Sequence, residues 1–403
     1  MNLAKLVFAF VKRKPLTWAF HVLTLTLGVG VVVAVILLSQ ALDNRFNRDI
    51  AGVDLVVGAK GSPLQLIMSA LFEIDIPNGN IPLSVAERLA HHPLVRQAVP
   101  VSLGDNVHGL RIVGTTPAYA SLYNAALARG RWWNAPLQVV LGADSAKLLQ
   151  MDLGATFVGQ HGLAAGGEMH TQFPYRVVGV LQPTGSVIDR LALTDTSSVW
   201  RIHEHEAAEE AAESGQAAMP MREHEVTALL IRYKGALGAV VLPQQVRAIP
   251  DVQAAVPALE AARLNQLLGA GASVLRWFGI ALLGLSALGF FIALFAAVQQ
   301  RQRELALLRV LGAGGSVLLG VTMLEALLLG VLGGALGIAL GRAMAAIAGA
   351  AASQHGGPAL PLPPLGPVEA IALAAAIGIS IAAALAPGLI AARIDPAETL
   401  KAG

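Results

Sequence analysis

Long stretches without charge alternate with one central block of mixed polarity along the chain. A bilayer core of about 30 Å needs about 20 apolar residues when they form a helix. Four stretches meet that length, namely residues 16–38, 277–300, 311–341 and 370–392. Glu325, in the third stretch, is the one charged residue within them. The pattern predicts four transmembrane helices, with residues 43–276 between the first and the second.

The central block has the short, punctuated segments of an α/β domain. Ser62 and Pro63 predict the start of a helix at 64–72, and residues 84–87 form a capping box for a helix ending near His92. Strand-like runs lie at 95–101, 107–113, 138–141, 156–160 and 175–181, and a strand, a helix and a strand follow at 226–233, 238–248 and 252–256. We expect an α/β domain into which a β-rich subdomain, about residues 130–200, is inserted.

Both junctions between this block and the apolar stretches predict helix. Residues 39–48 can continue the first span outward, and residues 258–276 can lead into the second. Two such helices would form a stiff stalk. The expected organisation is therefore a first transmembrane helix within residues 1–42, an α/β domain at 43–276, and three further spans within 277–403.

Composition supports a membrane protein. Of 403 residues, 55% are hydrophobic and 13% are charged, against about 25% charged in an ordinary soluble domain. A disordered chain or a basic nucleic-acid-binding arm needs a more polar composition, so nucleic acid is not an expected partner. The chain has no cysteine, which excludes disulfides, thiolate zinc sites and a cysteine nucleophile.

The first span has two interpretations. Lys12, Arg13 and Lys14 precede it and a small-x-small sequence follows at 39–41, as in a cleaved signal peptide. Its apolar region exceeds 20 residues, however, whereas signal peptides have about 7–15. An uncleaved anchor is therefore favoured.

The distribution of basic residues predicts the orientation. Nine lie in the N-terminal segment, the loop after the second span and the tail: Lys5, Lys12, Arg13, Lys14, Arg301, Arg303, Arg309, Arg393 and Lys401. The connection between the third and fourth spans, residues 342–369, has only Arg342. Since positive charge stays on the cytoplasmic side, both termini are expected in the cytoplasm and residues 43–276 outside it.

A short amphipathic helix is expected at about 299–313, directly after the second span. By composition alone it is either a basic anchor at the membrane surface or a contact for another protein. The segment RQRELALLRVLGA, residues 301–313, resembles the signature of the FtsX-like permease family, the membrane subunits of MacB-type ABC transporters of the lipoprotein-release and macrolide-export kind. The tail RIDPAETL, residues 393–400, and the order of one span, a large outer domain and three spans are similar to that family too.

The resemblance implies a coupling role for this helix. In such transporters it docks on a cytoplasmic ATPase, which here would be a separate chain, because this sequence has no G-x-x-x-x-G-K-[ST] phosphate loop. That partner would bind ATP and magnesium, and no cofactor is expected in this chain. The polar rim of the contact would be Arg301, Arg303, Glu304 and Arg309, with Leu305 and Leu308 at its apolar centre. The resemblance also implies the bacterial inner membrane, a periplasmic outer domain, a second permease copy, membrane lipid and a periplasmic adaptor or binding protein.

Small residues and one acid stand out in the third span. Its glycines form overlapping G-x-x-x-G spacings at Gly330, Gly333, Gly334, Gly337 and Gly341. Such a face lets backbones approach closely, either within one subunit or at a dimer seam. Glu325 must pair, protonate or face water, so it is either a structural hydrogen-bonding group or part of an ion path.

One cluster of histidines and acids lies at 203–225. His203, His205 and His224 offer three imidazoles that could bind zinc. The same Ala- and Glu-rich segment also has the composition of a solvated, mobile insertion, which is the favoured interpretation. We find no recognisable catalytic set, so the chain is expected to be a transporter subunit and not an enzyme.

The expected function is mechanotransmission. Closure of the partner ATPases on ATP would shift the coupling helix and move the outer domain, which would export a substrate or extract it from the outer leaflet or periplasm. The alternative is a signalling scaffold that transports nothing and activates an extracytoplasmic partner such as a cell-wall hydrolase. An ion-coupled transporter that uses Glu325 is harder to reconcile with four spans.

Overall fold

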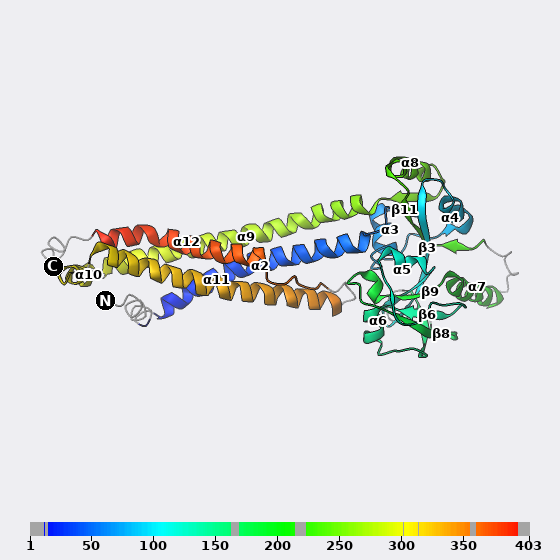
Figure 1. The fold of residues 1–403 in the computed structure, drawn as a ribbon, viewed down its shortest axis with the longest axis horizontal. Coiled ribbons are helices and arrows are strands. Elements are labelled where there is room, and N and C mark those ends of the chain that lie inside the picture. Colours follow the sequence, from blue (N-terminus) through cyan, green and yellow to red (C-terminus); the bar gives the residue numbers. More distant parts are fainter. Residues whose placement is uncertain are drawn as a thin grey trace. The chain divides into compact units, whose positions relative to one another are not determined.

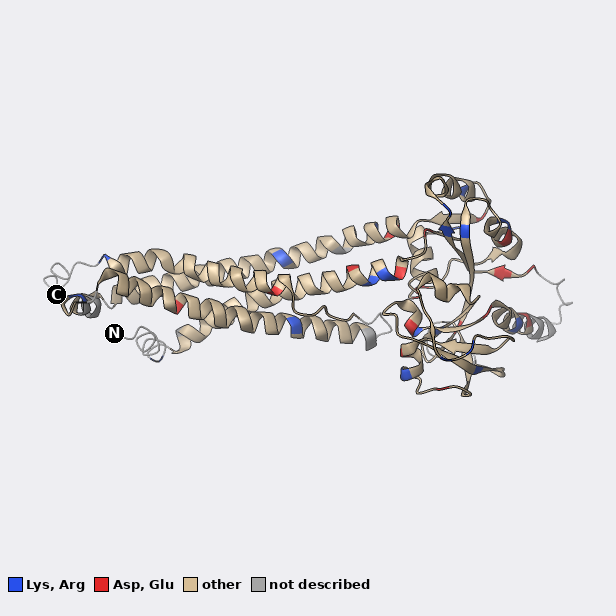
Figure 2. Cartoon of the chain, viewed as in Figure 1, with Lys and Arg blue, Asp and Glu red and all other residues tan. Residues whose placement is uncertain are grey.

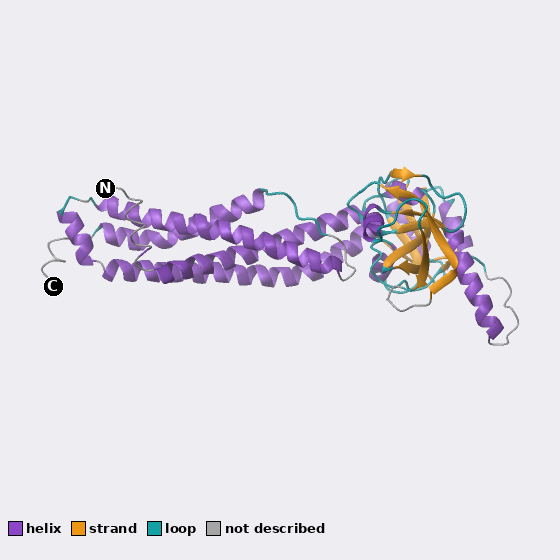
Figure 3. Cartoon of the chain, turned by 90° about the horizontal axis from the view of Figure 1, so that it is seen from below, coloured by secondary structure: helices purple, strands orange, loops and turns teal. Residues whose placement is uncertain are grey.

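The computed structural model describes residues 12, 15–162, 169–213, 223–300, 302–312, 314–354 and 360–393. The chain divides into two compact units. The first comprises residues 1–42, 267–353 and 359–403, and the second comprises residues 43–266 and 354–358. Figure 3 shows the strands gathered in the second unit, whereas the first is built of helices.

Four long helices lie side by side in the first unit (Figure 1). They are α2 (Pro15–Ile50), α9 (Pro257–Gln300), α11 (Gly315–Gln354) and α12 (Pro367–Ala392), and the short α10 (Gln302–Val310) follows α9. All four are long and apolar enough to cross a membrane, and Figure 2 shows few charges along them. The prediction of four membrane-spanning helices is confirmed. Both α2 and α9 continue into the second unit, so the predicted helices at 39–48 and 258–276 are confirmed too.

The helices of the first unit pack along narrow apolar faces. On α2, every fourth residue is buried: Leu25, Val29, Val33 and Leu37. These side chains pack with Ala345 of α11 and Ala376 of α12, because residues four apart share one face of a helix. A second core joins α9, α11 and α12 through Phe290, Leu294, Ala326, Leu329 and Ala384.

The five glycines of α11 fill the closest approaches between these helices. A Cβ at Gly337 would stand 2.6 Å from Val29 Cβ, and one at Gly341 would stand 2.7 Å from the Gly30 carbonyl oxygen. Gly333 faces Leu25 in the same way, so three of the five pack on α2. Gly330 and Gly334 face α12, at Ile377 and Leu373. At all five positions the chain's own atoms fill the space, as packing within one subunit requires, and the dimer seam stays a prediction.

The second unit is one large sheet with helices against it. Its strands are β1 (Leu55–Ala59), β3 (Val95–Val107), β4 (Leu110–Thr115), β5 (Leu127–Gly130), β6 (Gln138–Leu141), β7 (Thr156–His161), β8 (Met169–Leu181), β9 (Ala192–Asp195), β11 (Ala228–Tyr233) and β12 (Val252–Ala255). The order is β12-β1-β11-β3-β4-β9-β6-β8-β5, with β7 paired to β3 and β8. Pairs β4/β9 and β6/β8 are parallel and the others antiparallel. A small second sheet pairs β2 (Ile81–Pro82) with β10 (Glu225–Val226).

The second unit also contains helices, some of which pack on two separate cores. They are α3 (Pro63–Ala70), α4 (Leu83–Ala90), α5 (Ala118–Leu122), α6 (Ala143–Leu148), α7 (Thr196–Glu213), α8 (Ala236–Arg247) and the 3-10 turn η1 (Val187–Arg190). One core includes Leu55 of β1, Leu89 of α4 and Leu242 of α8. The other includes Ile112 of β4 and Ile202 of α7. The mixed α/β class of this unit is confirmed.

Some local predictions hold and others are corrected. Ser62 caps α3 as predicted, since its side chain accepts a hydrogen bond from the Gln65 amide at 3.4 Å. The capping box at 84–87 is wrong, because α4 begins at Leu83 and Ser84 lies inside it, where its amide bonds to the Glu223 carboxylate at 3.1 Å. The predicted mobile insertion is also corrected in part, since α7 runs as a helix to Glu213.

We predict that Gly337→Ala destabilises the first unit by about 1–3 kcal/mol, the usual cost of adding a methyl group to a closely packed core. Gly378, on α12, has no atom within 4 Å of a built Cβ, so Gly378→Ala is the matched control. It should be neutral or slightly stabilising, because alanine favours the helix. Thermal unfolding of the purified full chain in detergent measures both, and equal midpoints would contradict the close packing.

Candidate functional site

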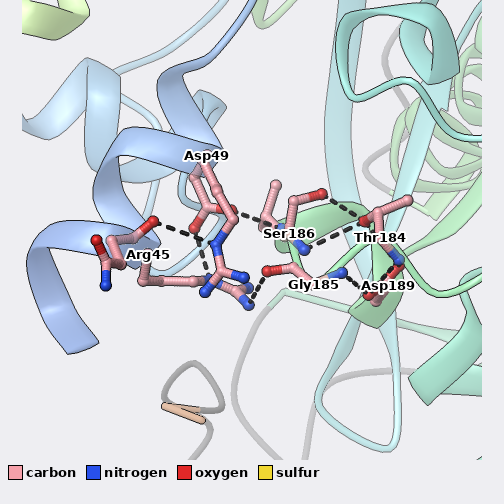
Figure 4. A network of polar contacts seen from close by, with 9 residues as sticks. Arg45, Asp49, Thr184, Gly185, Ser186 and Asp189 are labelled. Carbon is pink, nitrogen blue, oxygen red and sulfur yellow. Dashed lines mark hydrogen bonds and ion pairs between the residues drawn. The ribbon is translucent and has the colours of Figure 1, made fainter. Parts of the chain in front are cut away.

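A buried ion pair fastens the last turns of α2 within the second unit (Figure 4). Arg45 Nε donates to Asp49 Oδ2 at 2.8 Å, and the two side chains are only 6% and 4% exposed. Arg45 Nη1 also donates to the Gly185 carbonyl oxygen at 3.1 Å. The Val187 amide donates to Asp49 Oδ1 at 2.7 Å. One pair of side chains on α2 therefore holds the backbone of a loop more than 130 residues away in sequence.

That loop is built around a second carboxylate, Asp189. The amides of Thr184 and Gly185 donate to Asp189 at 3.0 and 2.7 Å, and the Thr184 hydroxyl donates to it at 2.9 Å. Thr184 Oγ1 also lies 2.7 Å from Ser186 Oγ. Gly185 has φ +73°, a conformation that glycine adopts without strain. The shape of the loop is therefore held by its own hydrogen bonds as well as by its contacts with α2.

A buried acid lies in the segment after α3, which packs against the end of α2. Phe72 packs on Phe46 of α2 with ring centroids 5.1 Å apart. The next residue, Glu73, is 8% exposed, and Arg111 Nε approaches its Oε2 at 3.6 Å. This ion pair is too long for a hydrogen bond. Burial outweighs the attraction of Arg111 and raises the pKa of Glu73 to about 7.

Glu73 makes the stability of the protein depend on pH. Its folded-state pKa of about 7 lies above its ordinary value of 4.5, so the folded state holds this proton more tightly than the unfolded state does. The contribution of Glu73 to stability is therefore present below pH 4.5 and is lost as the pH rises to about 7.

We predict that Glu73→Gln raises the melting temperature at pH 8 and leaves it nearly unchanged at pH 4.5, because the amide stands in for the protonated acid. Thermal unfolding of the full chain at both pH values measures the difference. Glu87→Gln, at an exposed position of α4, is the control and should shift neither midpoint. A Glu73→Gln chain with the wild-type pH profile would refute the assignment.

The short helix α10 packs at one end of the first unit (Figure 1). Ala306 of α10 is fully buried with Val298, Leu318 and Ala391, which come from α9, α11 and α12. Arg309 Nη1 donates to the Ala392 carbonyl oxygen at 3.4 Å, one of the carbonyls that the end of α12 leaves without a helical partner. The predicted short helix is therefore present, and it contacts the ends of three long helices.

Most of the predicted coupling residues cannot be placed at the level of side chains. Outside the described part lie Arg301, the side chains of Arg303, Glu304, Leu305 and Leu308, and the tail from residue 394 onward. Their roles stay predictions. The structure adds three apolar side chains that the sequence analysis missed, Leu307, Val310 and Leu311, which are 52%, 63% and 83% exposed. The same leucine-rich pattern that predicted the helix contains them, but it does not say which of its faces is buried.

Two polar side chains lie within the long helices. Glu325 of α11 is half-buried and interacts with another group. Its role, either structural or in an ion path, stays a prediction. The sequence analysis missed His21 of α2, which is 7% exposed and lines a small cavity with Ser286 and Ser380. Neither of its ring nitrogens has a hydrogen-bond partner among the described residues.

The structure does not bring the predicted zinc ligands together. His205 bonds to Gln172 Oε1 at 2.9 Å. His224 bonds to Glu204 Oε1 at 3.0 Å and stacks on Trp200. His203 instead turns toward β3, at Gly104. These three histidines therefore form no common ligand set, because α7 directs His203 and His205 to different surfaces and His224 lies outside α7, before β10.

Comparison with known proteins agrees with this architecture. Residues 18–212 match the model of the MacB-like periplasmic core domain, and residues 277–396 match that of the FtsX-like permease C-terminal domain. No curated protein matches the chain in sequence.

Two solved structures are similar to part of the chain. One is the periplasmic region of MacB from Actinobacillus actinomycetemcomitans, at 14% identity and a TM-score of 0.34, covering 56% of this chain and 98% of that one. The other is the extracellular domain of the noncanonic ABC-type transporter YknZ from Gram-positive bacteria, at 11% identity and a TM-score of 0.29, covering 50% and 98%. With one family model matched in the outer domain and the other over the last three spans, the chain belongs to the FtsX-like permeases of MacB-type transporters.

Proposed function

We propose that the chain couples ATP hydrolysis in separate cytoplasmic ATPase subunits to movement of its own outer domain. Permeases of this family work with such ATPases, and the partner would bind the ATP and magnesium. The chain would lie in the bacterial inner membrane with both termini in the cytoplasm and the second unit in the periplasm. Its movement would export a substrate or extract it from the outer leaflet. Two permease copies, membrane lipid and a periplasmic adaptor or binding protein would complete the assembly.

The observation that carries this proposal is the fastening of α2 at Arg45 and Asp49. An uninterrupted helix of 36 residues is about 54 Å long, whereas the bilayer core is about 30 Å thick. The helix is therefore long enough to span the membrane and still reach the loop at 184–189. Because the ion pair fixes both Gly185 and Val187, a displacement of α2 would pull directly on that loop.

The exposed apolar side chains of α10 support the other part of the proposal, the docking of the ATPase. Leu307 and Val310 of α10, and Leu311 directly after it, leave apolar surface exposed, whereas Ala306 of the same helix is buried against three other helices. A protein partner that covers this surface would gain the apolar burial that drives most association. Pressure on α10 would then be passed to α9, α11 and α12 together.

We predict that Leu307→Asp combined with Val310→Asp lowers recovery of the ATPase at least about tenfold, since charges in an apolar contact cost affinity. The assay is co-purification of a candidate cytoplasmic ABC ATPase with the full-length chain. Leu365→Asp is the matched control, because Leu365 is 72% exposed and lies before α12, remote from α10 in sequence. Undiminished recovery in the double variant would refute α10 as the docking surface.

The ATPase rate of the same purified complex distinguishes transport from signalling. If a transported substrate raises the ATPase rate, the permease function holds. If only a cell-wall hydrolase raises it, the chain is the non-transporting scaffold, and the coupling would be the same while the output differs.

We also predict that Arg45→Met lowers the free energy of unfolding by about 3–5 kcal/mol, because it leaves the Asp49 carboxylate buried without its charged partner. Arg48→Met, at an exposed position one turn away, should change it by less than about 0.5 kcal/mol. Urea unfolding of the full chain in detergent, followed by circular dichroism, measures both. Equal effects of the two substitutions would show that Arg45 does not fasten the helix.

A further inference from the structure

Three histidines and an aspartate meet at the end of β3 in the second unit. Asp105 lies on β3, His161 ends β7, His170 lies on β8 and His203 lies on α7. His170 Nε2 is 3.2 Å from Asp105 Oδ1, and His161 Nδ1 is 3.8 Å from the same oxygen. The rings of His161 and His203 have centroids 5.8 Å apart. The coupling pathway uses none of these four side chains.

The sheet brings two of them together through its register. Antiparallel pairing of β3 with β7 places Asp105 directly opposite His161. On its other edge β3 pairs with β4, and its register shifts between Leu103 and Asp105, so Gly104 is the extra residue of a β-bulge. Bulges redirect the side chains next to them. Here the side chain after the bulge, Asp105, is fully buried.

Packing of α7 supplies the third ligand. Val199 and Ile202 are buried in the core at 2% and 0% exposure, which fixes the rotation of α7 against the sheet. The imidazole of His203 then lies over Gly104, where a Cβ would stand 2.6 Å from Cε1 and 2.7 Å from Nε2. The missing side chain at the bulge therefore leaves the space that the His203 ring occupies.

Two potential ligand atoms in this cluster are buried and have no hydrogen-bond partner among the described residues: Asp105 Oδ2 and His203 Nε2. Buried polar atoms are nearly always satisfied, and an exception calls for an explanation such as an ion. One ligand atom each from Asp105, His161 and His203 can be chosen so that all lie within 4.8 Å of one another. A carboxylate oxygen and two imidazole nitrogens are a zinc-binding combination.

We propose that Asp105, His161 and His203 bind a Zn²⁺ ion. His170, at 3.2 Å from Asp105 Oδ1, is a positioning residue that donates its ring N–H to that oxygen and leaves Oδ2 for the metal. Such a hydrogen bond to a ligating carboxylate is a usual second layer of a metal site. Imidazole ligands favour Zn²⁺ over Mg²⁺ or Ca²⁺, which prefer oxygen.

The geometry needs only a small closure around the ion. Tetrahedral ligands with bonds of about 2.0–2.2 Å stand about 3.4 Å apart, so the three donor atoms would move inward by about an ångström. His161 is half-exposed at 53%, which opens the site to ions from solvent. The bound ion would join β3, β7 and α7 by direct bonds, a role that goes beyond coupling and does not depend on it.

Metal binding by the full-length chain in detergent tests the proposal, with an affinity tag that contains no histidine. Chelator-stripped protein is titrated with Zn²⁺ against a competing indicator, and with Co²⁺ to record the visible absorption of a low-coordinate nitrogen and oxygen site. We expect one tight Zn²⁺ ion per chain that excess Mg²⁺ or Ca²⁺ does not displace. Zn²⁺ should also raise the melting temperature, because it binds the folded state.

Matched variants separate this site from general binding by surface histidines. His203→Ala and His161→Ala should each weaken Zn²⁺ binding at least about 100-fold, the upper end of what loss of a supporting residue costs, and abolish the Co²⁺ spectrum. His205→Ala on the same helix and His224→Ala remove one histidine each and should leave the Zn²⁺ affinity nearly unchanged, because these two side chains bond to Gln172 and Glu204 and lie outside the proposed ligand set.

Gly104→Ala retains every ligand but places a methyl group against the His203 ring, so it should weaken binding as well. Circular dichroism confirms that each variant is folded. His161 is half-exposed, so His161→Ala keeps the test valid even if His203→Ala fails to fold. Wild-type affinity in folded His161→Ala, equal losses in His205→Ala, or no tight Zn²⁺ in the wild-type chain would each overturn the proposal.

Discussion

The contact between Arg45 and Asp49 is the interaction on which the position of the end of α2 in the second unit depends. A guanidinium and a carboxylate that leave water are stable only when each meets the other and the remaining hydrogen-bonding positions are filled. Here the Gly185 carbonyl and the Val187 amide fill two of those positions. The end of α2 is consequently committed to one place on one loop, and Asp189 holds the same loop from its other side. Apolar packing alone would allow the helix to rotate or slide, whereas directed charges do not.

The two units obey different constraints. In the first, apolar side chains face outward as well as inward, and the helices are held by close backbone approach at glycines. In the second, a conventional core lies on both sides of a mixed sheet, and it tolerates a few buried charges only where partners exist. Glu73 shows the limit of that tolerance, because Arg111 Nε donates to the backbone carbonyl oxygen of Glu73 and lies 3.6 Å from its carboxylate, near enough to attract the carboxylate but too far to bond to it. The pKa of Glu73 is raised because the attraction of Arg111 does not offset the burial of the carboxylate.

The sequence predicts the features that depend on local pattern. Four apolar stretches and the helices that extend the first two follow from length and composition, and Ser62 with Pro63 marks the start of α3. Helix propensity could have predicted α7, since Ala and Glu are strong helix formers, but the polar composition of this segment also fits a mobile insertion. Partners distant along the chain could not be predicted. A G-x-x-x-G spacing does not say which helix it faces, and nothing near Asp105 indicates that β7 will place His161 opposite it across 56 residues.

The contact between α2 and α11 has a mechanical consequence. Leu25, Val29 and Val33 meet Gly333, Gly337 and Gly341, so protrusions and hollows repeat along both helices with the same spacing of four residues. Axial travel of one helix past the other by less than that repeat, about 6 Å at 1.5 Å per residue, would drive methyl groups into backbone. The interdigitated side chains and glycines therefore block sliding of α2 along α11. Any axial displacement shorter than the four-residue repeat must move both helices together as one rigid body.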